Sequence, residues 1–128
     1  MKKLQINKHD TIVVQMFEWY DAKNGNTYNA LTIKIVRKGG VIGTLRRGME
    51  YGYGSAGSTA MQLMTKVLGL NGLTIHHLKE VKQVAWVVAA HCKVSKWTLE
   101  RNWSNTLEWE GTVYKYDPCN FTGFHLDV

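Results

Sequence analysis

Cysteine and proline are both scarce in this chain. The two cysteines, Cys92 and Cys119, form no Cys-x-x-Cys pair, which excludes a disulfide framework and a zinc ribbon and favours reduced thiols in a cytosol. A single proline beside five tryptophans, six tyrosines and three phenylalanines excludes a disordered or low-complexity chain. The 128 residues, 45% of them hydrophobic, can bury one core. We therefore predict a single domain over residues 1–128.

Long apolar runs are absent as well. No stretch approaches the roughly 18 apolar residues that a membrane-spanning helix needs. Met1–Leu4 leads into polar residues instead of the apolar segment of a signal peptide. The sequence therefore predicts a cytoplasmic protein that has no membrane partner.

Acidic residues are nearly missing between Ala22 and Lys79. This region holds eight cations and one acid, Glu50, so it carries a charge of +7, while the rest of the chain sums to −1. A basic region of this kind suits an anionic partner such as a nucleotide, a nucleic acid or an acidic protein face. A solvated basic face without a ligand is the alternative.

Three strands are predicted in the first third of the chain. Each is rich in β-branched or aromatic residues or alternates between apolar and polar positions; they are Thr11–Tyr20, Thr27–Lys38 and Val41–Arg47. Turn-forming residues at Asp21–Asn26 and the pair Gly39-Gly40 separate them. This pattern predicts an antiparallel three-stranded meander with a basic solvent-facing side.

The second half predicts one or two helices and a hairpin. Thr59–Leu68 has helical apolar spacing, and Thr59 with Gln62 matches a capping box. Thr74–Val94 fits either a helix or a strand, and its β-branched density favours a strand over Val84–Val88.

Ser95 could cap a short helix that runs through Arg101. The tail, Thr106–Tyr116 and Phe121–Val128, predicts a closing hairpin around Asp117-Pro118. The predicted fold is therefore α+β: an antiparallel sheet, made of the N-terminal meander and the C-terminal hairpin, packed with one or two helices.

A glycine-rich stretch joins the third strand to the first helix. Gly52–Gly57 matches G-x-G-x-x-G, and Gly52–Thr59 has the spacing of a P-loop with Ser58 in place of its lysine. No acid occurs between Ser58 and Lys79, as a dinucleotide fold would need, and phosphoryl transfer lacks its lysine. Both enzyme families are therefore excluded.

The physics beneath those motifs still predicts an anion-binding site. A flexible turn before a helix presents unpaired N–H groups and the positive end of the helix dipole. Hydroxyls, stacking rings and two arginines complete the candidate ligand-binding set: Arg46, Arg47, Tyr51, Gly52, Tyr53, Gly54, Ser55, Gly57, Ser58 and Thr59. The alternative is a tight strand-to-helix connection whose tyrosines pack on the core.

Residues 84–103 predict a second, competing site. They resemble a degenerate helix-turn-helix with Ala89 at the helix crossing and Val94-Ser95 as the turn. The surface that would face a DNA groove consists of Ser95, Lys96, Trp97 and Arg101. Two positions depart from the motif, because Lys93 stands in place of its glycine and Asn102 in place of an apolar anchor.

Catalytic and metal-binding sets are not indicated. His76 and His77 are adjacent and diverge on any regular element, and His91-Cys92 has no partner at recognised ligand spacing. No acid, base and nucleophile set comes together from the sequence, so we predict a non-enzymatic protein with no cofactor. Exposed tryptophans would permit association of identical chains.

Short motifs carry a family resemblance. Trp19-Tyr20, Asn26–Tyr28 and Tyr51–Gly54, followed by the Thr59-Ala60 helix, resemble small accessory proteins encoded by bacteriophages over residues 19–68. The resemblance implies action in the bacterial host cytoplasm by binding host molecules, including inhibition of host defence. The first hypothesis is capture of an anionic, nucleotide-like ligand at the glycine-rich stretch. The second is binding of nucleic acid or a host nucleoprotein through the basic face.

Overall fold

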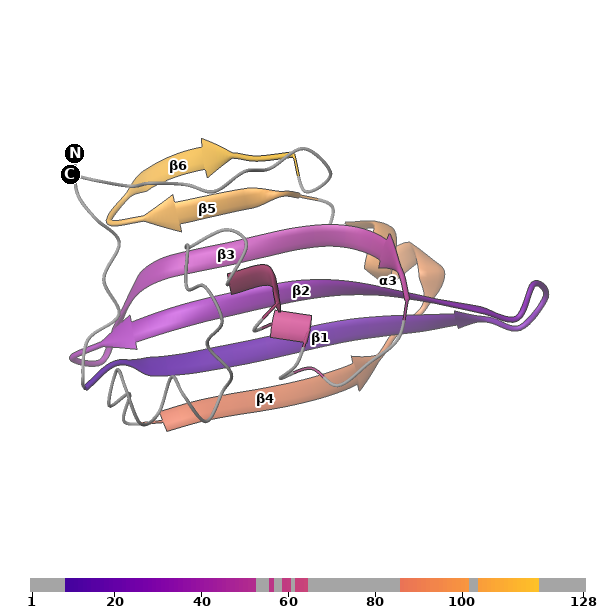
Figure 1. The fold of residues 1–128 in the computed structure, drawn as a ribbon, viewed down its shortest axis with the longest axis horizontal. Coiled ribbons are helices and arrows are strands. Elements are labelled where there is room, and N and C mark those ends of the chain that lie inside the picture. Colours follow the sequence, from indigo (N-terminus) through magenta and orange to yellow (C-terminus); the bar gives the residue numbers. More distant parts are fainter. Residues whose placement is uncertain are drawn as a thin grey trace.

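Six strands form one mixed sheet in the order β4-β1-β2-β3-β5-β6 (Figure 1). The computed structural model describes residues 9–52, 56, 59–60, 62–64, 86–101 and 104–117, and for residues 86–89 the backbone alone. The elements are β1 Thr11–Asp21, β2 Asn26–Arg37, β3 Gly40–Tyr51, β4 Trp86–Lys93, α3 Lys96–Arg101, β5 Thr106–Trp109 and β6 Thr112–Lys115. Except for β1 and β4, neighbouring strands are antiparallel, so the α+β prediction is confirmed at this level.

The predicted meander of three strands is present as β1, β2 and β3. Its first loop is fixed by Asp21, whose Oδ1 accepts hydrogen bonds from the amides of Lys23 and Asn24, as in an Asx-turn. The second turn is centred on Lys38 and Gly39, which both have positive φ, so the predicted pair Gly39-Gly40 is wrong by one residue. Arg37 and Gly40 are the paired residues that close this two-residue loop.

An ion pair joins the start of β1 to the end of β2. Asp10 is fully buried and accepts two hydrogen bonds from the Arg37 guanidinium, at 2.8 and 2.9 Å. The hydrogen bonding to Asp10 raises the pKa of Arg37 above its ordinary value. This fork-shaped contact fixes the register of the β1–β2 pair at the end away from its loop.

The sequence pattern of Thr74–Val94 fits both a helix and a strand. The structure describes a strand there, β4. All eight residues of β4 pair in parallel with Thr11–Glu18 of β1, so the sheet is mixed and the prediction of a purely antiparallel sheet is wrong. The predicted helix-turn-helix over residues 84–103 is also wrong, because its first helix would occupy the residues of β4. The alternating apolar residues suit a strand that pairs with β1.

The predicted helix after Ser95 is confirmed as α3. The Ser95 hydroxyl accepts a hydrogen bond from the Thr98 amide at 3.2 Å and so caps the helix. The prediction of a single strand over Thr106–Tyr116 is wrong, because this segment folds back on itself as the β5–β6 hairpin, with Glu110 and Gly111 at positive φ in the turn. Pro118 of the predicted turn and the predicted return strand Phe121–Val128 lie outside the described residues.

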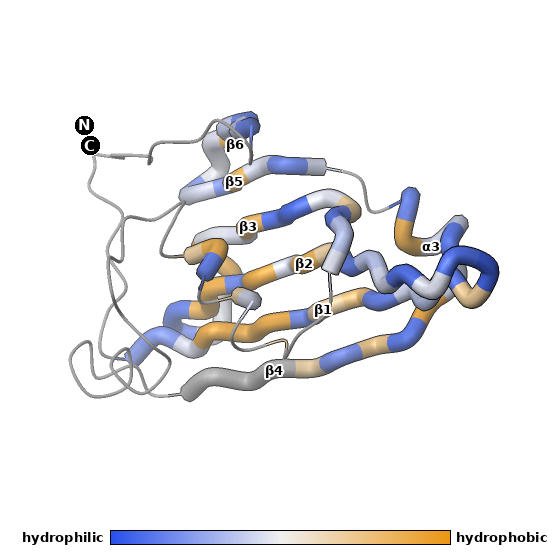
Figure 2. Tube along the Cα trace, turned by 45° about the vertical axis from the view of Figure 1, so that its right-hand side comes forward, coloured by the Kyte–Doolittle hydropathy of each residue, from blue (hydrophilic) through white to orange (hydrophobic). Residues whose placement is uncertain are grey.

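The core covers one face of the sheet. Alternate residues of adjacent strands face the same side, and the register aligns Ile12 with Ile35 and Val14 with Ile33, and Ile33 in turn with Leu45. We call this side the core face and the opposite side the outer face. Figure 2 shows the hydrophobic residues along β1 and β2 that contribute to the core.

Helical residues cover the core face. Ala56, Ala60, Leu63 and Met64 are buried in the same cluster as the strand residues, and Figure 1 shows this segment over the middle of the sheet. They confirm helical conformation within the predicted Thr59–Leu68 helix as far as Met64, and its remainder lies outside the described residues. Thr59 is itself helical, so its predicted role as the residue before the helix is wrong.

α3 packs on the outer face. Its residue Leu99 is fully buried, and α3 contacts β1 and β3. Within the described parts of the chain, no helix is long and apolar enough to cross a membrane.

Candidate functional site

The glycine-rich stretch is described at its two ends. Tyr51 ends β3 with 72% of its surface exposed. Gly52 follows at φ +137°, where its amide donates to the Thr27 carbonyl and its own carbonyl accepts from Asn29 Nδ2, both at 2.8 Å. The backbone polar groups of Gly52 are therefore bonded within the protein. Thr59 is half-buried and helical, and the other predicted residues, Tyr53, Gly54, Ser55, Gly57 and Ser58, lie outside the described residues.

The two predicted arginines do not act together. Arg46 and Arg47 are consecutive on β3, so their side chains lie on opposite faces of the sheet. The two arginines of the predicted ligand-binding set therefore do not share one face of the sheet. Arg46 aligns with Thr32 and Thr106 on the outer face, where it is half-exposed.

Arg47 is buried on the core face and is engaged by the protein itself. Its guanidinium donates to the side-chain and main-chain oxygens of Asn29 and to the Gly48 carbonyl, and lies 3.4 Å from Glu50 Oε2. Burial lowers the pKa of Arg47 from its ordinary value, while Glu50 acts in the opposite direction. Arg47 therefore has a structural role at the point where β3 bends.

That bend determines where Tyr51 lies. Arg47 aligns with Leu31, but Glu50 aligns with Asn29, so β3 contains one extra residue opposite Ala30. Such a bulge shifts the side-chain alternation by one position. It places Tyr51 on the outer face beside Tyr28, although Arg47, four residues earlier, is on the core face.

Three aromatic rings form a row across the ends of β1, β2 and β3. Trp19 stacks on Tyr28 with ring centroids 5.5 Å apart and planes 20° apart. Tyr28 meets Tyr51 edge-on, with centroids 5.8 Å apart. The strand register produces this row, because Trp19 aligns with Tyr28 and Tyr28 aligns with Tyr51.

α3 adds two cations and a fourth ring. Lys96 Nζ lies 5.6 Å from the centroid of the Trp19 ring, so it links the helix to the row. Arg101 Cζ lies 4.3 Å from the centroid of Trp97, which has 65% of its surface exposed. Residues four apart lie on the same side of a helix, so Trp97 and Arg101 both face away from buried Leu99.

Trp19, Tyr28 and Tyr51 form a row at the end of the sheet, Lys96 joins α3 to this row, and α3 also carries the exposed Trp97–Arg101 pair. We call these residues together the aromatic–cationic surface: Trp19, Tyr28, Tyr51, Lys96, Trp97 and Arg101. Exposed rings can stack on nucleobases, and adjacent cations can bind phosphates. Chemically, the surface can therefore hold a ligand that combines aromatic rings with negative charge.

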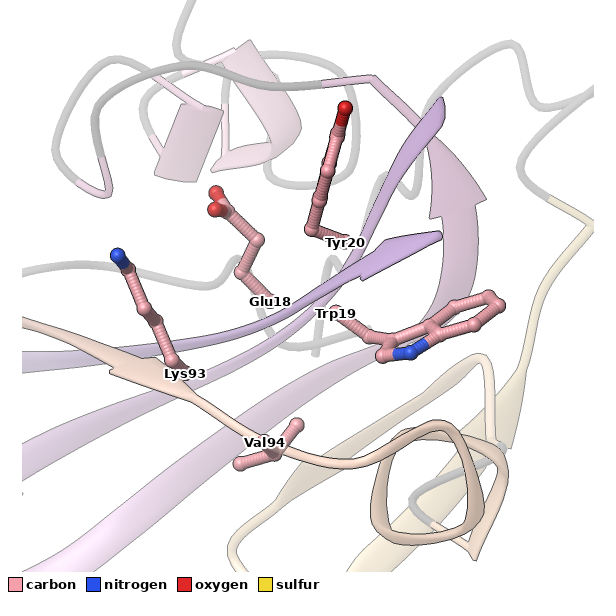
Figure 3. A pocket seen from close by; sticks show the side chains of 5 residues that line it. All are labelled: Glu18, Trp19, Tyr20, Lys93 and Val94. Atoms are coloured by element: carbon pink, nitrogen blue, oxygen red, sulfur yellow. The ribbon is translucent and has the colours of Figure 1, made fainter. Parts of the chain in front are cut away.

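A shallow pocket of about 360 Å³ lies beside this surface, where the ends of β1 and β4 separate (Figure 3). Glu18, Tyr20 and Lys93 line it on one side, and Trp19 and Val94 point the opposite way. His91 Nε2 lies 2.8 Å from Glu18 Oε2, so the Glu18 carboxylate is already engaged with a neighbouring strand. The described residues contain no group of three or more His, Cys, Asp or Glu that could hold a metal ion.

The sequence predicts four of the six residues of this surface, but in other contexts. Lys96, Trp97 and Arg101 were grouped as part of a helix-turn-helix, and Tyr51 was included in the anion-binding site of the glycine-rich stretch. Trp19 and Tyr28 were absent from the predicted site. The signal for them was their equal distance from the Asp21–Asn26 loop, which aligns them across a hairpin.

Comparison of the chain with protein-family models, with curated proteins and with solved structures gives no match. The geometry of the described residues therefore carries the functional proposal.

Proposed function

We propose that the protein binds nucleic acid through the aromatic–cationic surface and carries out no chemistry there. The observation that supports this proposal is the continuous contact from Lys96 through Trp19 and Tyr28 to Tyr51. Exposed aromatic rings beside cations, such as Tyr51 and Trp97 here, are typical of an interaction site. Stacking and phosphate binding together give them a use.

The charge of the outer face supports an anionic partner. Lys34 and Lys115 are exposed on this face, and Arg46 is half-exposed there. Two acids offset them in part, since Glu108 lies on the same face and Glu100 Oε1 is 3.9 Å from Lys96 Nζ. The excess positive charge would draw a polyanion toward the face and make binding dependent on salt.

Salt dependence tests the proposal. We expect fluorescence anisotropy with labelled oligonucleotides to detect binding. The logarithm of the association constant should fall linearly with the logarithm of the salt concentration. Lys96→Gln and Arg101→Gln should each lower the slope by about one unit. Lys38→Gln is the matched control, because Lys38 is exposed in the turn at the opposite end of β2.

Two results would contradict this function. Binding that is absent or insensitive to salt would remove direct recognition of nucleic acid. An effect of Lys38→Gln equal to that of Lys96→Gln would show that charge anywhere on the protein suffices, which excludes a defined surface.

Capture of a nucleotide-like ligand at the glycine-rich stretch is a second candidate. Tyr51 favours it, because this exposed ring stands at the start of that stretch and could stack on a base. Calorimetry with mononucleotides and cyclic dinucleotides tests it. Heat of binding that disappears in Gly54→Val but persists in Trp97→Ala would support this candidate over the surface on α3.

The biological setting follows from the sequence resemblance alone. We propose an accessory protein of bacteriophage type that acts in the host cytoplasm on a host nucleic acid, nucleoprotein or nucleotide signal. Purification of the protein from bacterial cells, followed by ultraviolet absorbance and mass spectrometry of any bound molecule, tests this setting. Recovery of protein free of nucleotide and nucleic acid from several hosts would count against it.

A further inference from the structure

We infer that the partner of the aromatic–cationic surface is a single-stranded nucleic acid whose bases stack on Trp97 and Tyr51. This inference rests on the proposed function and deepens it, because nucleic acid in general could be bound through its phosphates alone. The structure separates the rings that are available for stacking from those that are already in use.

Trp19 and Tyr28 are largely in use. Both are half-buried, and each contacts a neighbour on either side in the series Lys96, Trp19, Tyr28, Tyr51. They support the surface and position its outer members. The exposed rings are Tyr51 in this series and Trp97 on α3, with 72% and 65% of their surfaces accessible to solvent.

Exposed aromatic rings such as these can stack on unpaired bases. In a duplex, each base is stacked between its neighbours, whereas single strands can place bases against aromatic side chains. Tyr51 lies at the end of a sheet strand, and Trp97 lies on a helix held against the sheet by fully buried Leu99. Neither ring can reach a base inside a duplex without base extrusion, which costs a few kcal/mol.

Within the aromatic–cationic surface, the one helix, α3, is too short to act as a recognition helix in a duplex groove. Recognition helices enter the major groove along several turns, and α3 has six residues, or about 9 Å at the helical rise. Its Lys96 end is held near the sheet through Trp19. A flat surface made of a sheet end and a short helix fits an unstacked strand better.

The cations sit where a single strand would place its phosphates. Arg101 lies against the Trp97 ring, which fixes the ring and leaves guanidinium N–H groups for a phosphate. Lys96 is adjacent to Trp97 in α3 and reaches the Trp19 ring in the row on the sheet. Each group of rings therefore has a cation beside it, as recognition of bases and phosphates in one strand requires.

A comparison of the affinities for single-stranded and double-stranded oligonucleotides tests the inference. Fluorescence anisotropy would be measured with a labelled thymidine oligonucleotide of about 15 nucleotides and with its duplex. We expect the single strand to bind at least about tenfold more tightly. Trp97→Ala and Tyr51→Ala should each weaken single-strand binding by roughly 5- to 150-fold, the value of one stacked base, while Trp97→Phe retains most of it.

The chain offers matched controls. Tyr20 is 59% exposed and points away from Trp19, toward the other side of the sheet (Figure 3). Val113 is 58% exposed on β6. Tyr20→Ala and Val113→Ala should leave single-strand binding unchanged, because neither residue belongs to the aromatic–cationic surface.

The outcomes separate this inference from the function on which it rests. Equal or tighter binding of the duplex overturns the inference and leaves nucleic-acid binding in place. Preference for the single strand with unaltered affinity in both Trp97→Ala and Tyr51→Ala overturns the stacking surface. Absence of binding to both oligonucleotides overturns the inference and the proposed function together.

Discussion

Trp109 lies directly over the backbone of Gly43 on the neighbouring strand. The two residues align across the β3–β5 pair, and a Cβ atom at position 43 would overlap Cε3 and Cζ3 of the indole. Gly43 is buried, and Trp109 is 7% exposed within the core. The missing side chain of Gly43 is therefore what allows a large ring to lie flat on the sheet.

Gly43→Ala should destabilise the protein. Because the core is closely packed, the indole would have to move or leave its rotamer, and we expect a loss of about 1–3 kcal/mol in the free energy of unfolding. Urea unfolding followed by circular dichroism measures it. Gly40→Ala is the control, since its Cβ would meet only the Arg37 carbonyl at 3.8 Å. Equal effects of the two substitutions would contradict the packing explanation.

Stability should fall at alkaline pH because of Tyr116. Its hydroxyl donates to the Arg46 carbonyl at 2.6 Å, and burial raises its pKa well above the ordinary value of about 10. Above about pH 10 the unfolded chain loses this proton while the folded protein retains it. The contribution of Tyr116 is therefore complete below that pH and declines as pH rises.

Tyr116→Phe separates the hydrogen bond from the titration. At neutral pH it should lower the free energy of unfolding by about 1 kcal/mol through loss of the hydrogen bond. The difference from the parent protein should shrink as the pH is raised, because phenylalanine does not titrate. Thermal unfolding between neutral and alkaline pH measures this, with exposed Tyr20→Phe as control. A constant difference across that range would refute the role of Tyr116.

Arg47 should affect stability and not binding. Arg47→Met removes the donor to Asn29, which is 4% exposed, and a buried acceptor without its donor costs about 1–3 kcal/mol. Arg47→Lys should fall between the parent and Arg47→Met. Urea unfolding ranks the three proteins. Oligonucleotide affinity should be unchanged for Arg47→Lys, and a binding loss comparable to that of Lys96→Gln would restore Arg47 to the site.

Local patterns in the sequence predict the meander and α3. They misplace the β2–β3 turn by one residue and miss the β5–β6 turn, because residues without an obvious turn signature, Lys38 and Glu110, adopt positive φ beside a glycine. The parallel pairing of β4 with β1 is a contact between distant segments that short-range periodicity does not encode. Strand alternation alone places the consecutive residues Arg46 and Arg47 on opposite faces of the sheet, once it is known that β3 continues past them.

The candidate site was harder to predict than the fold. Tyr51 reaches the outer face through a bulge, and one extra residue in a strand reverses every later side-chain position. Lys96 of α3 meets Trp19 only because the chain returns across the outer face after β4. A surface assembled from β1, β2, β3 and α3 is thus a product of tertiary structure.

Ser95 should control the surface through the cap of α3. The helix has six residues, and Ser95→Ala removes a cap worth about 0.5–2 kcal/mol. Because α3 carries Trp97 and Arg101, we expect weaker oligonucleotide binding together with a lower melting temperature. Ser95→Asn keeps a capping oxygen and should preserve both. Normal binding by Ser95→Ala would show that α3 is held by the sheet alone.

The parallel position of β4 has a consequence for the order of folding. β1, β2 and β3 follow one another along the chain and can pair as soon as residues 11–51 have been synthesised. Until Trp86–Lys93 follows, the other edge of β1 has no strand on it from this part of the chain. An open strand edge is a template for pairing with other chains, and long-range pairing is slow. The docking of β4 therefore closes one of the two strand edges through which the nascent meander is exposed to aggregation, and β5 later closes the other, on β3.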